Sequence, residues 1–289
     1  MKIAIVGGAG KMGTWIGRFL KAENICVSLI DTDADKLATA MRELEVEGSG
    51  DLRKAGESDA IIISVPITSF ESTAKVLSPY LREGQTVIDV TSVKTMPVET
   101  MHRHFPRCLV LGAHPVFGPG ATGLEGHNIV LTPTTTKEKA LAEQAKNFLE
   151  ERGARVQAMT PEEHDRLMAV VLGLAHYIAI VSGDTMLSLD NLAGMEMVSG
   201  VTFRVLMTMI VSVLGEDPSL YASIQTHLPD LPFLEGIFVA RASEWAELVK
   251  QKDNAELIRR MTTLTQKLAR MTPAPGSAYR NMYNIAEGR

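Results

Sequence analysis

A glycine-rich stretch near the start of the chain has the residue types and spacing that bind a dinucleotide. The GxGxxG pattern at residues 8–13 follows the apolar run Ile3–Val6 and opens a helix-like segment, which is the context that gives this pattern its meaning. Gly8 allows a tight turn, Gly10 lets the backbone approach a pyrophosphate, and Gly13 lets the helix pack closely on the strand. N–H groups at the helix start would hold the phosphates. The residues expected at the cofactor are Gly8, Gly10, Lys11, Met12 and Gly13.

An acidic residue further along the chain indicates which dinucleotide binds. Asp31 follows the second apolar run, Val27–Ile30, 18 residues after Gly13, where a carboxylate can bond both ribose hydroxyls. A 2′-phosphate beside Asp31 would be repelled, and Thr32-Asp33 offers no arginine to receive it. The sequence therefore favours NAD, with NADP the weaker alternative.

Polar residues also follow three later apolar runs. The stretch Ser64-Val65-Pro66 ends the run from residue 60 and would lie along the cofactor, although it reads equally well as a strand that proline terminates. The stretch Ser92-Val93-Lys94 comes just after Thr86–Val90 and offers a hydroxyl and a cation near a nicotinamide. Because ligands bind at the carboxyl ends of parallel strands, these positions are candidate site residues.

The third stretch, His-Pro-Val-Phe-Gly-Pro at residues 114–119, follows the run from Leu109. Its proline-flanked backbone could aim the His114 imidazole into a cleft. A neutral imidazole is suited to accept a proton near pH 7. His114 is therefore a candidate base.

The elements that must position these residues form two halves. Up to about residue 156, apolar runs alternate with helix-like stretches, which is typical of a mainly parallel sheet covered by helices. The predicted strands are Ile3–Val6, Val27–Ile30, Ala60–Val65, Thr86–Val90, Leu109–Leu111 and Ile129–Leu131, and the predicted helices cover about 11–22, 34–43, 68–81, 95–104 and 137–152.

After Met159 the strand signals stop. Thr160-Pro161-Glu162-Glu163 is typical of a helix start, and helices are predicted at about 161–187, 191–214, 218–227, 231–251 and 254–271. We thus expect an α/β fold class with two domains: an N-terminal Rossmann dinucleotide-binding domain, 1–158, followed by an all-α C-terminal domain, 159–289.

Composition excludes several classes of protein. A net charge of -5 and a pI near 5.8 give no general attraction to nucleic acid or to a membrane surface. Cys26 and Cys108 are too few for a disulfide framework or a metal site, so we expect a reducing cytoplasmic location and no metal. The first apolar run begins so early that we expect no signal peptide. The apolar stretch 167–182 carries His176 and is expected to be a buried helix.

Taken in order, these motifs resemble the prephenate dehydrogenase family, in which a GxGxxG start precedes S-V-K and an H-P-x-F-G-P turn. The resemblance covers nearly the whole chain, and residues 114–119 are its most specific part. It implies that His114 accepts a hydrogen bond from the ring hydroxyl of the substrate and that Ser92 assists. It also implies a homodimer and a role in tyrosine biosynthesis.

The same resemblance implies residues that bind substrate. Prephenate has two carboxylates, so its site needs cations or strong donors. Gly200-Val201-Thr202-Phe203-Arg204 resembles the segment that supplies a carboxylate-binding arginine, and His176 matches a substrate-contacting histidine, although a hydrogen-bonded core histidine is also consistent. Lys94 could face substrate or cofactor. The His164-Asp165 pair also matches the family, and we expect it to be structural.

Three alternatives remain open. Arogenate dehydrogenase differs in accepting an amino acid side chain on the substrate instead of a pyruvyl one. A 3-hydroxyacid dehydrogenase would share the glycines and Asp31 but would rely on a helical lysine. A nucleotide-sensing protein without turnover would keep the fold alone, yet His114, Ser92 and Arg204 are all present.

Overall fold

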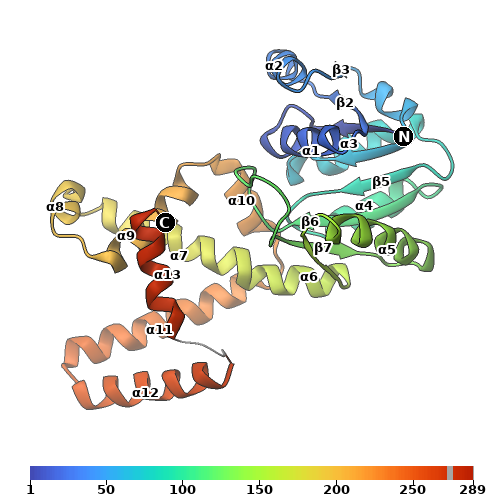
Figure 1. The fold of residues 1–289 in the computed structure, drawn as a ribbon. Coiled ribbons are helices and arrows are strands. Elements are labelled where there is room, and N and C mark those ends of the chain that lie inside the picture. The colour runs from blue at the N-terminus through green and yellow to red at the C-terminus, as the bar shows by residue number, and fades with distance from the viewer. Residues whose placement is uncertain (272–275, 289) are drawn as a thin grey trace. The chain divides into compact units, whose positions relative to one another are not determined.

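The computed structural model describes residues 1–271 and 276–288 and contains two compact units, Met1–Met168 and Ala169–Arg289 (Figure 1). The first unit is built on one sheet, and the described part of the second is helical. The helix Pro161–Met168 groups with the first unit, although we expected the domain boundary just before it, between residues 158 and 159. This grouping matters because the helix carries two residues of the site.

The sheet of the first unit has eight strands in the order β3-β2-β1-β4-β5-β6-β7-β8. Neighbouring strands are parallel except at β6 and β7, which are antiparallel. The strands are β1 Lys2–Val6, β2 Cys26–Ile30, β3 Glu47–Ser49, β4 Ala60–Ile63, β5 Thr86–Asp89, β6 Leu109–Pro115, β7 Asn128–Thr132 and β8 Arg155–Ala158. The carboxyl ends of β1, β4, β5 and β6 therefore share one edge of the sheet, where nucleotides bind in such folds.

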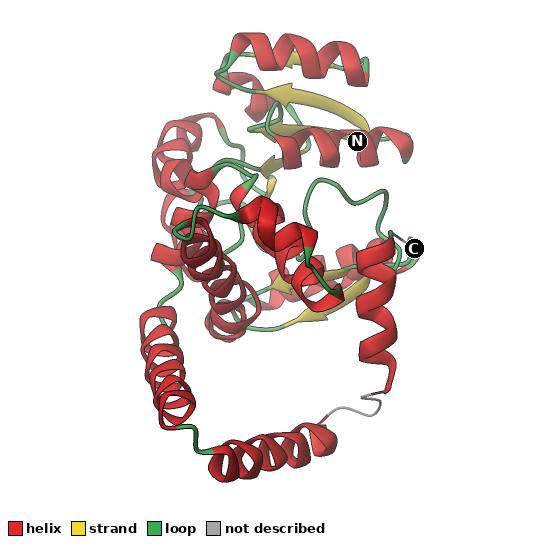
Figure 2. Cartoon of the chain, turned by 90° about the vertical axis from the view of Figure 1, so that its left-hand side faces the viewer, coloured by secondary structure: helices red, strands yellow, loops and turns green. Residues whose placement is uncertain are grey.

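Helices cover both faces of this sheet, and Figure 2 shows the yellow strands between red helices. They are α1 Lys11–Ala22, α2 Ala34–Leu44, η1 Leu52–Glu57, α3 Ile67–Leu77, η2 Ser78–Tyr80, α4 Thr95–His104, α5 Thr136–Glu150 and α6 Pro161–Met168. Alternate residues of the strands enter two cores: Ile5 and Leu111 pack on one face, and Val6 and Val110 on the other. This alternation follows from the two-residue period of a strand, and it places His114 on the face opposite Ala113.

The described part of the second unit consists of helices. They are η3 Ala169–Leu174, α7 Ala175–Leu187, α8 Leu192–Met197, α9 Val201–Leu214, α10 Pro218–His227, α11 Leu231–Gln251, α12 Asn254–Met271 and α13 Gly276–Glu287. Small residues let these helices approach: a Cβ on Gly173 would lie 2.8 Å from the Leu231 methyls, and one on Gly183 would lie 2.7 Å from Leu214. Apolar packing of this kind holds the unit together.

The structure confirms the predicted fold class and adds elements that the apolar pattern did not reveal. Strand β3 reads Glu-Gly-Ser and β8 reads Arg-Val-Gln-Ala, so neither has an apolar run. Helix α13 was not predicted. The predicted helix 161–187 is continuous but contains a π-helical segment, Ala169–Leu174, and such a bulge commonly marks a functional region.

The same helix, Pro161–Leu187, has the length and hydropathy of a membrane span, with 28% of its apolar window buried. A core helix of a soluble protein can have the same length and hydropathy but is mostly buried, so the expectation of a buried helix at 167–182 is wrong for the single chain. One such helix is weak evidence for a membrane.

Candidate active site

The glycine-rich loop joins the end of β1 to the start of α1. Gly7, which the sequence analysis did not single out, makes the turn with a left-handed φ of +79°, and its N–H donates to the Ile30 carbonyl at 2.8 Å. A Cβ on Gly7 would lie 2.4 Å from the Ser64 carbonyl oxygen, and one on Gly8 would lie 2.8 Å from the Ile5 carbonyl oxygen. The role that we gave to Gly8 alone therefore belongs to both residues, because neither position has room for a side chain.

The start of α1 is shaped to receive an anion. A Cβ on Gly13 would lie 2.2 Å from the Gly7 carbonyl oxygen, so only glycine brings the helix this close to the loop. Gly10 is the N-cap and no side chain caps the helix, which has no acidic residue in its first turn. The first N–H groups of a helix lack intrahelical partners, and in α1 these groups directly follow the Gly10 N-cap. This cradle fits the pyrophosphate of a dinucleotide.

Asp31 lies directly beside this loop. Its Oδ2 accepts a hydrogen bond from the Ala9 N–H at 3.0 Å, and its Oδ1 accepts one from the Asp33 N–H at 3.0 Å. The carboxylate is thereby held at the end of β2, next to the turn, where the ribose of a dinucleotide would lie.

The stretch after β4 borders the same loop. The Ser64 N–H donates to the Val6 carbonyl at 2.8 Å, and the Val65 Cγ1 lies 3.1 Å from the position that a Cβ on Gly7 would take. Pro66 is exposed and forms the N-cap of α3. All three residues thus lie at the edge of the sheet where the cofactor is expected.

The structure places Lys94 in the interior of the first unit, and its predicted contact with substrate or cofactor stays a prediction. Its side chain is fully buried, and its Nζ forms an ion pair with Asp89 and donates to the Ala113 carbonyl at 2.8 Å. Gly112 leaves room for this side chain, since a Cβ there would lie 3.2 Å from the Lys94 Cδ. Burial raises the pKa of Asp89 and lowers that of Lys94, while their mutual attraction acts against both shifts. The ammonium therefore joins β5 to β6 inside the unit.

His114 lies near the carboxyl end of β6 and is buried, with 4% of its surface exposed. Its Nδ1 lies 2.8 Å from the Nε2 of His164 on α6, and the two rings meet edge to face at 5.0 Å between centroids. No residue within 1–271 and 276–288 hydrogen-bonds the other ring nitrogen, Nε2. That atom is therefore available to a ligand.

Burial, assisted by the neighbouring His164 and Lys94, holds the pKa of His114 well below its ordinary value of 6.5. The imidazole is consequently neutral at pH 7, and one of its nitrogens can accept a proton. This is the protonation state that a general base needs.

Ser92 occupies the turn between β5 and α4 and is half-buried. The turn is fixed on both sides of it: the Thr91 N–H donates to Asp89 at 2.8 Å, and the Thr91 hydroxyl donates to the Val93 carbonyl at 2.9 Å. The hydroxyl of Ser92 is thus carried by a rigid segment at the same sheet edge as His114.

His164 and Asp165 were expected to be structural, but His164 contacts the candidate base directly. Its Nδ1 lies 2.8 Å from the Asp165 Oδ1, and both residues are buried. Asp165 also accepts hydrogen bonds from the N–H groups of Lys94 and Thr95, at 2.7 and 2.9 Å. Apolar periodicity carries no signal that α6 packs against α4 and β7, which is why sequence reasoning missed this contact.

In the helical unit, His176 has an unsatisfied polar atom. Its Nδ1 is buried without a hydrogen-bond partner, and its ring packs edge to face on Tyr221 at 4.7 Å between centroids. Burial lowers the pKa of His176. A core histidine would normally have its nitrogens bonded, so the hydrogen-bonded core histidine does not describe this geometry, and the contact with substrate stays a prediction.

Arg204 lies in the first turn of α9, and its side chain is exposed. Within the described residues its guanidinium pairs with no carboxylate. A cation in this state can receive a substrate carboxylate, so the position is consistent with the predicted role.

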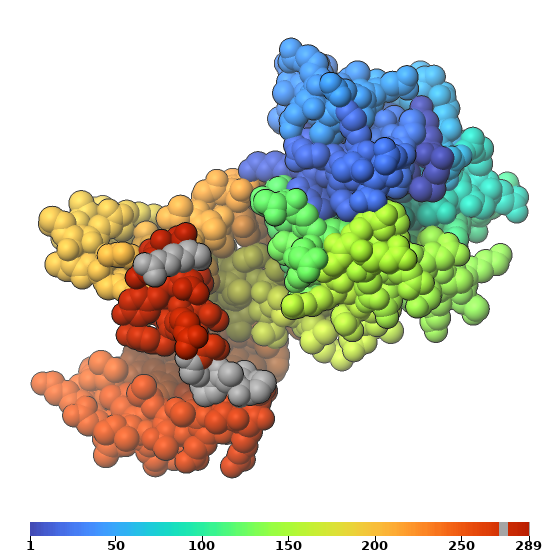
Figure 3. Space-filling view, viewed as in Figure 1, coloured from blue at the N-terminus to red at the C-terminus, as the bar shows by residue number. Residues whose placement is uncertain are grey.

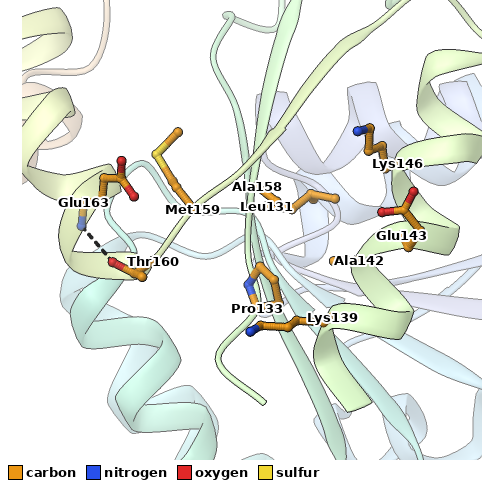
Figure 4. Close-up of a pocket in the computed structure, with 10 residues that line it drawn as sticks. All are labelled: Leu131, Pro133, Lys139, Ala142, Glu143, Lys146, Ala158, Met159, Thr160 and Glu163. Carbon is orange, nitrogen blue, oxygen red and sulfur yellow. Dashed lines mark hydrogen bonds between the residues drawn. The ribbon is translucent and has the colours of Figure 1, made fainter. Parts of the chain in front are cut away.

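A separate cavity of about 420 Å³ lies in the first unit, between α5 and the start of α6 (Figure 4). Lys139 and Lys146 line it together with Glu143 and Glu163, and its lining includes none of the predicted site residues. The cavity is therefore distinct from the nucleotide cradle and from His114.

Comparison with known proteins identifies both units. The nucleotide-binding domain model of prephenate dehydrogenase matches residues 16–158, and the dimerization domain model of the same enzyme matches residues 160–263. Together the two models span most of the chain.

Individual relatives agree with these models. The chain is 32% identical over 266 residues to a probable arogenate/prephenate dehydrogenase of Methanocaldococcus jannaschii, with 90% of this chain and 59% of that protein covered. It is 30% identical over 226 residues to the T-protein of Haemophilus influenzae, with 77% of this chain and 55% of that protein covered. The chain thus spans a little over half the length of these curated relatives.

A solved structure shares the fold. The prephenate dehydrogenase of A. aeolicus, in complex with hydroxyphenyl propionate and NAD+, superposes with a TM-score of 0.77 at 24% identity and covers 94% of this chain and 98% of that one. The two matching domain models and these relatives show that the chain belongs to the prephenate dehydrogenase family.

Proposed function

We propose that this protein oxidatively decarboxylates prephenate to 4-hydroxyphenylpyruvate with reduction of NAD, a step of tyrosine biosynthesis. The observation that carries the proposal is His114, a buried neutral imidazole whose Nε2 is open to a ligand at the carboxyl edge of the sheet. Membership of the prephenate dehydrogenase family supports the substrate class.

In this reaction His114 accepts the proton of the ring hydroxyl at Nε2. NAD, when bound, accepts the hydride that leaves the same carbinol carbon. The bond to the ring carboxylate then breaks, carbon dioxide leaves, and its electron pair completes the aromatic ring while the proton returns to the ring oxygen. Aromatisation makes the step strongly downhill, so the protein mainly has to orient the substrate. Ser92 would assist by donating to or accepting from the same hydroxyl.

The residues of the first unit fit a dinucleotide. Gly7, Gly8 and Gly13 leave no room for side chains where the pyrophosphate would approach, and the α1 start is uncapped. The Asp31 carboxylate beside the loop supports NAD over NADP, because it would bond the ribose hydroxyls and repel a 2′-phosphate. The NAD+ in the A. aeolicus complex agrees with this choice.

The second unit would supply the substrate's other contacts. Arg204 offers a guanidinium for a carboxylate, with two parallel hydrogen bonds available from its planar head. His176 offers a buried nitrogen that lacks a partner. We assign both to substrate binding.

A homodimer formed through the helical unit accompanies this function. Ile258, Met261 and Leu264 lie on one face of α12, and each is more than half exposed, at 66, 61 and 53%. The orange segment of α12 forms an outer edge of this unit in Figure 3. An exposed apolar stripe of this kind is typical of a surface that another protein buries. The match to a dimerization domain supports a second copy of the chain as that protein. A monomeric mass by light scattering at working concentration would contradict the dimer.

Two alternatives remain for the activity. Arogenate differs from prephenate only in its side chain, and the M. jannaschii relative carries both names. A nucleotide-sensing protein without turnover would use the same cradle. Family membership gives no support to a 3-hydroxyacid dehydrogenase. We place the enzyme in the cytoplasm, in keeping with its two unpaired cysteines.

The test follows NADH absorbance with prephenate or arogenate and with NAD or NADP. We expect turnover of prephenate with NAD in the parent protein, and a loss of about 10²–10⁴-fold in kcat for His114→Asn, the range for removal of a general base. His102→Asn is the matched control, because His102 is an exposed histidine of the same unit. Turnover of neither substrate would refute the proposal, and turnover of arogenate alone would establish the arogenate alternative.

A further inference from the structure

Three buried side chains form a continuous line of hydrogen bonds behind the candidate base. We call Asp165, His164 and His114 the histidine relay. Each of its two contacts measures 2.8 Å, from Asp165 Oδ1 to His164 Nδ1 and from His164 Nε2 to His114 Nδ1. A metal ion does not explain the second contact, since two zinc–nitrogen bonds of about 2.0–2.1 Å each would hold the nitrogens further apart.

The carboxylate at the far end determines where every proton lies. Burial alone would raise the pKa of Asp165, but hydrogen bonds from His164, Thr95 and Lys94 lower it below its ordinary value. An ionised carboxylate only accepts hydrogen bonds, so the His164 Nδ1 must carry the proton of that contact. In a neutral His164 the Nε2 is then an acceptor, and the His114 Nδ1 must donate to it. This leaves the His114 Nε2 without a proton.

The far end of the relay is rigid. Asp165 accepts from the Lys94 and Thr95 N–H groups, which are the N-cap and first residue of α4, and a carboxylate at that position is also favoured by the helix dipole. These residues lie two and three positions after Ser92. The relay therefore connects the turn that carries Ser92 to the imidazole on β6.

We propose that His164 and Asp165 are positioning residues that keep His114 in the tautomer with an unprotonated Nε2 and that share its positive charge during the reaction. This inference rests on the proposed function, in which His114 is the base. When the His114 Nε2 receives the substrate proton, the Nδ1 proton can move to the His164 Nε2. The positive charge then lies on His164 beside the ionised Asp165, and both protons return as the product ring oxygen is reprotonated.

Other charged groups around the relay act on its histidines in opposite directions. The Lys94 ammonium lowers the pKa of both histidines, but it is paired with Asp89 on β5. The hydrogen bond that His164 donates to Asp165 acts in the opposite direction and raises the pKa of His164.

The first measurement is nitrogen-15 NMR of the histidine rings in the parent protein without substrate. We expect His114 and His164 both to be protonated on Nδ1 and unprotonated on Nε2 at neutral pH. A proton on the Nε2 of His114 would overturn the proposal. This readout needs no turnover, so it decides the relay even if neither cyclohexadienyl substrate reacts and the proposed function fails.

Three variants then test the relay by activity. His164→Leu removes the acceptor for the His114 Nδ1 and should lower kcat by roughly 10²–10⁴-fold, the range for a base lost or held in the wrong tautomer, with the affinity for NAD unchanged. His164→Gln keeps an oxygen acceptor but cannot carry charge, so it should recover at least about tenfold of that loss. Asp165→Asn should keep the tautomer and still lower kcat, because an amide oxygen accepts hydrogen bonds but has no charge.

Glu162→Gln is the matched control, an exposed carboxylate on the same helix, and should turn over like the parent. NAD affinity verifies that each variant is folded. If His164→Leu does not fold, the NMR result and His164→Gln still decide. A parent-like kcat in His164→Leu would overturn the relay while the proposed function stands, and a parent-like kcat in Asp165→Asn would overturn the sharing of charge.

Discussion

Replacing Lys94 by methionine tests whether the Lys94 ammonium stabilises the fold or binds a ligand. Methionine keeps an unbranched side chain of similar length in the space beside Gly112 but removes the ammonium. The Asp89 carboxylate would then be left fully buried, and it would keep the hydrogen bond from the Thr91 N–H at 2.8 Å. The Ala113 carbonyl would also lose its donor.

The size of the effect follows from breaking a buried ion pair. Removing one partner costs about 3–5 kcal/mol, because the other charge stays buried without compensation. With a urea m-value of about 2 kcal/mol/M, that corresponds to a decrease of about 2 M in the unfolding midpoint. The double variant Asp89→Asn/Lys94→Met should recover most of the loss, since the amide can keep the bond to Thr91 and no charge remains.

Urea unfolding followed by the fluorescence of Trp15 measures this change in the first unit, in a Trp245→Phe background. Trp15 suits the assay because its indole is 7% exposed and donates to the Ala121 carbonyl at 2.6 Å. Lys54→Met is the control, because the Lys54–Glu57 pair is exposed at 54 and 60% and surface pairs contribute only about 0–1 kcal/mol. A parent-like midpoint together with a raised KM for substrate would refute the structural role and restore the ligand contact that the sequence suggested.

Further expectations concern the cofactor and pH. Gly13→Ala should weaken NAD binding by at least about tenfold, or 1.4 kcal/mol, because its Cβ would lie 2.2 Å from the Gly7 carbonyl oxygen. NADH fluorescence titration measures this change. Gly118→Ala is the control, because no atom lies within 4 Å of the Cβ that it adds. Asp31→Ser should raise the ratio of NADP to NAD turnover by about tenfold or more, and an unchanged ratio would show that Asp31 does not select the cofactor. The free energy of unfolding should fall as the pH drops below 6.5, the ordinary pKa of a histidine in the unfolded chain. The reason is that His114 and His164 bind protons in the unfolded chain at a higher pH than in the folded one. A urea midpoint that stays constant on acidification to about pH 5.5 would contradict the lowered pKa values.

Much of the fold could be predicted from the sequence, because apolar periodicity and helix-end residues are local features of the chain. Helices α1, α4, α10, α11 and α12 have the bounds that periodicity and end signals predict. The fold class followed from the alternation of apolar runs with helices. Strands β3 and β8 were missed because they have no apolar run, and they exist only because a neighbouring strand offers hydrogen-bonding partners.

The sequence by itself determined the glycine loop, the acidic residue after β2 and the histidine turn. Each is a short motif whose conformation depends on residues that are neighbours in the chain. Tertiary structure alone decided what the polar groups near the site contact. It turned Lys94 inward to Asp89 and brought His164 within hydrogen-bond distance of His114, 50 residues apart in the chain. Periodicity reports which face of an element is buried, whereas the partner across that face depends on how strands and helices from distant segments pack together.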